Sequence, residues 1–220
     1  PHDILYPAIP EAQYFKTLVG DLVNDRIEEM VVLGDQGSHV FKFTTNGLAV
    51  DVASQSRLNT LSASDGLLID IDFTGKLDLM AVTHRTNDLR LYRQFGPLSF
   101  NDVTVTSGVP DALRNARAVV MEDWNGDGIM DLIVSRASGP PLLLEKQRGG
   151  PLVPREQTHW ASGTVFCTGD FDNDLRPDLA VVADNKIAVC FNGETQKAIP
   201  LPTNTLIRHI VAIDYDNDGW

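Results

Sequence analysis

The chain contains the stretch DFDNDLRPDL, residues 170–179, and this stretch decides the fold because it recurs. A close copy, DWNGDGIMDL, begins at Asp123, and a third, DIDFTGKLDL, begins at Asp70. A degraded copy, DLVNDRIEEM, begins at Asp21, and DYDNDGW begins at Asp214. We name these segments loops one to five in chain order, starting at residues 21, 70, 123, 170 and 214. Their near-constant separation of about 48 residues predicts one repeat array over residues 1–220, with an incomplete last repeat.

Short apolar runs flank the loops and predict β-strands that are buried on both faces. Runs before the loops occupy 67–69, 119–121, 165–167 and 210–213, and runs after them occupy 30–33, 79–82, 132–134 and 179–182. Third strands are expected at 40–43, 89–92 and 187–191, and fourth strands at 103–105 and 197–199. Three or four strands in each repeat, without intervening helices, are typical of the blades of a β-propeller. The predicted fold is therefore all-β.

The chemistry of the loops predicts calcium binding. Counting the first Asp of each loop as position 1, oxygen-bearing side chains fall at positions 1, 3, 5 and 9. Hard oxygen donors in this number suit Ca²⁺. An EF-hand would need a Glu at position 12, where this chain has Ala81, Val134 and Val181. The loops therefore resemble calcium sites of another kind.

The five loops differ in their candidate ligands. Loops three and four are complete, although loop four has Leu175 where a glycine is expected at position 6. Loop two has a threonine at position 5 and should be weaker, and loop one has Val23, which cannot ligate, so no metal is expected there. The candidate ligands are Asp70, Asp72, Thr74 and Asp78 in loop two; Asp123, Asn125, Asp127 and Asp131 in loop three; Asp170, Asp172, Asp174 and Asp178 in loop four; and Asp214, Asp216 and Asp218 in loop five.

These loops resemble the FG-GAP or VCBS repeats of integrin-α-like propellers, in the group that includes cartilage acidic protein. The segment Phe100-Asn101-Asp102-Val103-Thr104, followed by Gly108-Val109-Pro110, is similar to the linker between blades in that group. The resemblance implies a propeller of seven or eight blades, of which this chain would hold about four and a half. It also implies an extracellular, periplasmic or cell-surface location.

Composition argues against nucleic-acid binding and against insertion into a membrane. The net charge is −12, with 18 basic and 30 acidic residues, so the chain is poorly suited to grip a nucleic-acid backbone. No apolar stretch is long enough to span a bilayer. Cys167 and Cys190 are expected to be buried thiols, with a disulfide as the alternative.

No catalytic residues are predicted, because the five histidines are scattered and the loops account for the clustered acids. We expect a non-enzymatic, calcium-stabilised binding or scaffolding module for a protein or carbohydrate partner, with self-association through open blade edges. The alternative is part of a polysaccharide-active, lyase-like enzyme. Trp124 and Phe171 are interpreted as packing residues, and His84, Arg85 and Trp160 are the loose candidates for a ligand surface.

Overall fold

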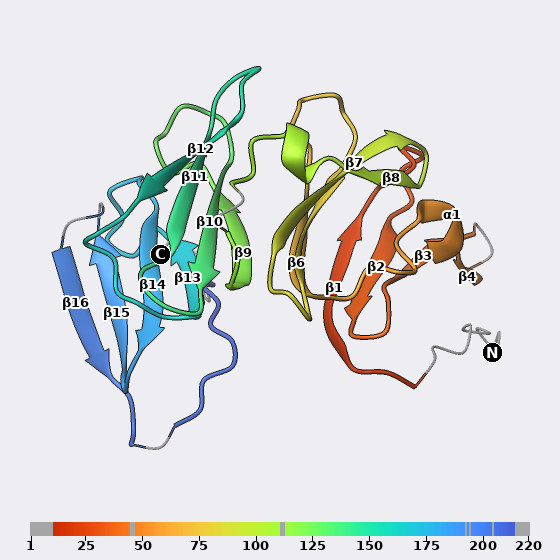
Figure 1. The fold of residues 1–220 in the computed structure, drawn as a ribbon. Helices are drawn as coiled ribbons and strands as arrows, with labels where there is room; N and C mark the ends of the chain where they lie inside the picture. The colour runs from red at the N-terminus through yellow and green to blue at the C-terminus, as the bar shows by residue number, and fades with distance from the viewer. Residues whose placement is uncertain are drawn as a thin grey trace. The chain divides into compact units, whose positions relative to one another are not determined.

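The computed structural model describes residues 11–44, 47–110, 113–191, 193, 195–203 and 205–213. These residues form four antiparallel sheets of four strands each, and every sheet is built from consecutive strands (Figure 1). The chain divides into two compact units, of which the first ends at Asp111 and the second begins at Ala112. The all-β prediction is confirmed.

Unit one contains two of the sheets, β1 to β4 and β5 to β8. Among the described residues of this unit, the helical content is one turn of α-helix, α1, and one 3-10 turn, η1. The bounds are β1 Tyr14–Gly20, β2 Glu29–Gly34, β3 His39–Phe43, β4 Ala49–Asp51, α1 Ala53–Ser56, β5 Ala63–Ile69, β6 Asp78–Thr83, β7 Leu89–Gly96, β8 Ser99–Asp102 and η1 Thr104–Thr106.

Unit two contains the other two sheets, β9 to β12 and β13 to β16. Each is again a meander in which neighbours in sequence are neighbours in the sheet. The bounds are β9 Ala116–Glu122, β10 Asp131–Arg136, β11 Leu142–Lys146, β12 Leu152–Glu156, β13 Val165–Gly169, β14 Asp178–Ala183, β15 Lys186–Phe191 and β16 Thr195–Pro200.

The second strand of each sheet is buried along most of its length, which explains its continuous apolar sequence. In unit one, Val31 of β2, Val40 of β3 and Leu79 of β6 belong to one core cluster, so this cluster draws on both sheets. In unit two, Ile133 of β10 and Leu179 of β14 share a cluster in the same way. Each unit is therefore a pair of sheets packed over a common apolar core.

Two predicted strands are absent. Residues 103–105 were expected to be a strand, but the chain forms η1 there, because the Asp102 carboxylate accepts hydrogen bonds from both the backbone N–H and the hydroxyl of Thr104. The fourth strand of that sheet is β8, which precedes them. Residues 210–213 are not a strand either. Ile210 instead packs against the apolar face around Cys167.

Candidate metal centres

The four described loops connect the first and second strands of the four sheets, as predicted. All four share one backbone conformation, in which positions 4 and 6 have positive φ. Glycine occupies both positions in loop three, and Leu175 adopts a φ of 66° at position 6 of loop four. The residues concerned are Asn24 and Arg26, Phe73 and Gly75, Gly126 and Gly128, and Asn173 and Leu175. Because most residues avoid this region, the shared pattern indicates one loop architecture.

The position 1 carboxylate holds each turn together. In loop three, the two carboxylate oxygens of Asp123 accept the backbone N–H groups of Asp127 and Gly128, at 3.0 and 2.9 Å. Asp170 in loop four accepts those of Asp174 and Leu175 at 3.1 and 2.8 Å. Asp21 and Asp70 make the equivalent pairs in loops one and two. The first Asp is therefore both a candidate ligand and the residue that shapes the loop.

The position 9 acid is buried at the beginning of the second strand. Glu29, Asp78, Asp131 and Asp178 are each at most 1% exposed. One oxygen of Asp78 accepts the backbone N–H of Gln94 on β7, and one oxygen of Asp131 accepts that of Lys146 on β11, both at 2.7 Å. In Asp78, Asp131 and Glu29, the other oxygen is buried and has no hydrogen-bond partner among the described residues.

Burying a carboxylate oxygen without a hydrogen-bond partner costs free energy, and this cost raises the pKa of these groups. Burial raises the pKa of Asp78 to about 6, with the carboxylates of Asp72 and Asp70 contributing. Burial likewise raises the pKa of Asp131 to about 6, with a contribution from Asp127. Each buried acid therefore feels the negative charge of carboxylates in its own loop. A bound cation would satisfy the unpaired oxygen and the loop carboxylates together.

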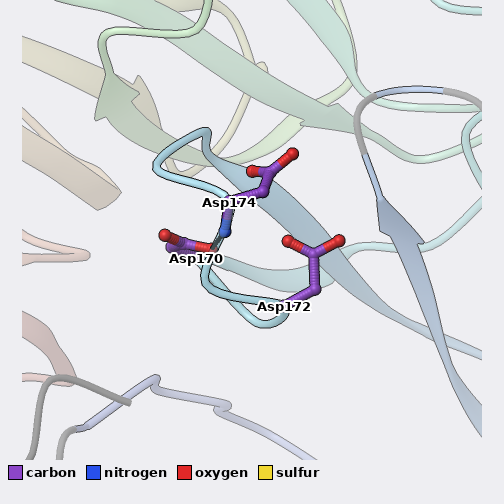
Figure 2. A group of neighbouring side chains, drawn as sticks. All are labelled: Asp170, Asp172 and Asp174. Atoms are coloured by element: carbon purple, nitrogen blue, oxygen red, sulfur yellow. Dashed lines mark hydrogen bonds between the residues drawn. The ribbon is translucent and has the colours of Figure 1, made fainter.

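Loop four brings three of its predicted ligands into one cluster. One carboxylate oxygen from each of Asp170, Asp172 and Asp174 lies within 4.8 Å of the others. Figure 2 shows the three side chains on the turn between β13 and β14. Partial loss of hydration, followed by the charges of Asp174 and Asp178, raises the pKa of Asp172. Oxygen donors at this spacing fit a hard cation such as Ca²⁺.

Loops two and three bring their predicted ligands together through hydrogen bonds. In loop two, the Thr74 hydroxyl donates to Asp72 at 2.8 Å. In loop three, the Asn125 amide donates to Asp127 at 3.2 Å, and the Asn125 oxygen accepts the backbone N–H of Asp127 at 2.9 Å. The predicted ligands Asp214, Asp216 and Asp218 of loop five lie outside the described residues.

A cavity of about 740 Å³ in unit two is lined by loops three and four, including Trp124, Asn125 and Arg176. Trp124 makes an edge-to-face contact with Trp160, with ring centroids 4.9 Å apart, and packs against the core. Its interpretation as a packing residue is supported. Trp160 was a candidate for an exposed ligand surface, and this is wrong because it is 3% exposed and belongs to the core cluster. Among the other loose candidates, His84 stacks on Phe15 and Arg85 is exposed.

Sequence reasoning missed a second polar arrangement, in unit one. The His39 ring lies between Asp51, at 2.6 Å from Nδ1, and the Tyr14 hydroxyl, at 3.3 Å from Nε2. All three residues line a cavity of about 400 Å³. They come from three different strands and share no local motif, so only the sheet register reveals them.

Comparisons with known proteins agree with this loop architecture. A family model described as an FG-GAP-like repeat matches residues 70–134 and 170–220. Mouse (Mus musculus) cartilage acidic protein 1 is 25% identical over 131 residues, which cover 56% of this chain and 20% of that protein. The chain therefore aligns with only a fifth of this curated relative.

Two solved structures share the fold at low identity. An Agrocybe aegerita lectin that recognises non-reducing terminal N-acetylglucosamine matches with a TM-score of 0.54 and 14% identity, over 87% of this chain and 53% of the lectin. BBS1N in complex with ARL6DN matches with a TM-score of 0.51 and 14% identity, over 86% of this chain and 55% of that chain. Together with the four sheets, these likenesses support a propeller-like, all-β fold.

No helix among the described residues is long and apolar enough to cross a membrane. The family match agrees with the repeated loops and with their shared backbone conformation. Since that match extends over more than half of the chain, the protein belongs to the family of FG-GAP-like repeat proteins.

Proposed function

We propose that the chain is a non-enzymatic binding or scaffolding module whose blades are stabilised by Ca²⁺. Loops three and four are the principal sites, and loop two is a weaker one. The observation that carries the proposal is the buried oxygen of Asp131 that has no hydrogen-bond partner among the described residues, in a carboxylate whose pKa is also raised by the charge of Asp127. The cluster of Asp170, Asp172 and Asp174 supports it independently. Ca²⁺ would supply positive charge to these oxygens, and the chain's own residues would hold the loop in shape.

The proposal includes an extracellular, periplasmic or cell-surface location. Extracellular modules bind Ca²⁺ with dissociation constants of about 10⁻⁴ to 10⁻³ M, which match the calcium available there and not in the cytosol. We propose a protein or carbohydrate partner. The cavity between loops three and four supports this, because it offers Asn125 and Arg176 as polar groups beside the Trp124 ring. The similarity in fold to a sugar-binding lectin makes a glycan the first class to screen.

Thermal unfolding tests the metal dependence. A chelator should lower the melting temperature, and excess Ca²⁺ should restore it. Asp174→Ala should remove the response of loop four and leave that of loop three, since the two ligand sets share no residue. Glu156→Gln is the matched control: it removes a unit-two acid whose partner is Arg136 and which lies in no loop. A melting temperature that is indifferent to both chelator and calcium would contradict the proposal.

The enzymatic alternative is favoured by one observation, the Tyr14–His39–Asp51 arrangement beside a cavity. Burial, together with the charges of Asp35 and Asp51, raises the pKa of Tyr14. A raised pKa keeps the phenol protonated at neutral pH, where it can act as a proton donor. Incubation of wild type and of His39→Gln with acidic polysaccharides tests for lyase activity. Unsaturated products that form only with wild type would establish a lyase.

A further inference from the structure

We propose that Lys42 and Arg93 are built-in cations that occupy the place of Ca²⁺ in loop one and oppose its binding in loop two. Calcium binding would then be concentrated in loops three and four. This inference rests on the proposed function and deepens it, because it assigns the difference between the loops to residues outside them.

The sheet register places one residue of the third strand opposite the position 9 acid in each blade. The position 10 residues Met30, Leu79, Leu132 and Leu179 pair with Phe41, Tyr92, Leu144 and Cys190. In antiparallel strands, the residue after each partner is opposite position 9. These third-strand residues are Lys42, Arg93, Glu145 and Phe191. The same structural position is therefore basic in unit one and not basic in unit two.

Both basic side chains reach into their loops. Lys42 Nζ lies 3.3 Å from the Asp25 carboxylate at position 5 of loop one. Arg93 Nε lies 3.3 Å from the Asp72 carboxylate at position 3 of loop two. The charge of Lys42 acts on buried Glu29 and that of Arg93 on buried Asp78, in both cases favouring the ionised acid. Each base therefore serves the same group of carboxylates that a metal would serve.

The bases occur where the ligand sets are incomplete. Loop one lacks an oxygen at position 3, where Val23 stands, and Lys42 contacts the acid at position 5. Loop two lacks an acid at position 5, where Thr74 stands, and Arg93 contacts the acid at position 3. A fixed positive charge suits the three carboxylates that remain in each loop, whereas a divalent ion binds less well where a carboxylate is replaced by a threonine hydroxyl and lacks a donor where it is replaced by valine.

Loops three and four have no such base. Glu145 carries a negative charge at the equivalent position and pairs with Arg155 at the edge strand β12, at 3.2 Å. Phe191 is uncharged. Among the described residues, the cluster of acids spaced to hold a metal is in loop four, and loops one, two and three do not form one. At this third-strand position, unit two therefore supplies no basic side chain to its loops.

Calcium titration of the full chain, labelled with nitrogen-15 and followed by NMR, tests the inference loop by loop. The Gly75 and Gly128 amides occupy position 6 of loops two and three, and each donates to the first Asp of its loop at 2.8 and 2.9 Å. Each amide therefore reports on its own loop. In wild type, Gly128 should respond at a lower calcium concentration than Gly75.

Arg93→Gln should lower the calcium midpoint of Gly75 by about tenfold, the effect of removing a unit charge a few ångströms from a divalent ion in a water-like dielectric. The Gly128 midpoint should not move. Arg90→Gln is the matched control, because Arg90 is on the same strand but pairs with Asp88 and Asp102, outside the loops. Equal Gly75 midpoints in the two variants would overturn the inference.

Loop one offers a second test that does not depend on Arg93. Val23→Asp supplies the missing ligand, and Val23→Asp combined with Lys42→Gln also removes the base. The double variant should bind calcium at loop one about tenfold more tightly than the single variant, as reported by the Arg26 amide. Equal binding by the two would contradict the role of Lys42. Absence of any Gly128 response would instead refute calcium binding at loop three, and so the proposed function itself.

Discussion

Replacing Asp131 with asparagine should have opposite effects on stability with and without calcium. The carboxylate is fully buried, one of its oxygens accepts the Lys146 N–H, and the other has no partner. Asparagine keeps an oxygen for Lys146 and removes the charge. Its amide N–H group would face the loop carboxylates, which accept hydrogen bonds. Without metal the substitution should therefore relieve an unfavourable buried charge, and with metal it should remove a ligand.

The pKa of Asp131 sets the magnitude. Burial raises this pKa from 3.8 to about 6. The folded protein therefore holds the proton more tightly than the unfolded chain, and the metal-free wild type loses stability as pH rises from about 4 to about 6. At pH 7 the difference of roughly two units corresponds to about 3 kcal/mol. Allowing for imperfect pairing of the new amide, Asp131→Asn should stabilise the metal-free protein by about 2 kcal/mol.

In the presence of calcium, the effect of Asp131→Asn on stability changes from stabilising to destabilising. A ligand that binds only the folded state at one hundred times its dissociation constant stabilises it by about 2.7 kcal/mol, and the variant should lose most of this. Urea unfolding followed by tryptophan fluorescence is a suitable assay, because Trp124 and Trp160 pack beside loop three. Destabilisation of equal size in chelator and in calcium would show that Asp131 is an ordinary structural acid and would refute the reasoning.

Three further predictions follow from the loops and the core. The calcium affinity of loop three should fall about tenfold per pH unit below about 6, because protons compete for Asp131; calorimetry at pH 7 and pH 5 would reveal a constant affinity if this is wrong. Leu175→Gly should stabilise loop four by about 1 kcal/mol in urea unfolding, since Leu175 has positive φ and is 89% exposed, and a loss of stability would contradict the strain. Cys167 and Cys190 should resist maleimide until the protein unfolds, because burial raises the pKa of both thiols; rapid labelling of the native protein would show access that the structure does not provide.

The sequence alone predicts most of the strands that flank the described loops, because apolar runs next to a repeated motif form a local signal; it misses β1 before loop one and wrongly places a strand at 210–213. It does not reveal β11 and β12. The β11 segment follows Pro140 and Pro141, and β12 contains Pro154, so the region resembles a loop in sequence. Pro154 is tolerated because β12 is the edge strand of its sheet and needs fewer backbone donors.

The ligand positions could also be predicted, since they lie within a single turn. The third-strand position opposite the position 9 acid could not be predicted in this way, although the residue there distinguishes the loops with a base from the loops without one. It lies 13 to 15 residues after the position 9 acid, and the offset changes with the length of the intervening hairpin. Only the register of the folded sheet aligns Lys42 with Arg93 and both with Glu145.

This alignment has a physical consequence for the repeat. Every described blade buries an acid where the second strand begins, and in three of them one carboxylate oxygen has no hydrogen-bond partner in the part of the chain that the structure describes. The charge that offsets such an acid can come from the solvent side as a divalent ion, or from the third strand as a basic side chain that pairs with a neighbouring loop carboxylate. A substitution at this third-strand position therefore exchanges a basic side chain for a bound divalent ion. It does not alter the turn, because the shape of the turn depends on the first Asp. Arg93→Gln tests this exchange by removing the basic side chain, and Asp131→Asn tests it by removing a ligand of the divalent ion.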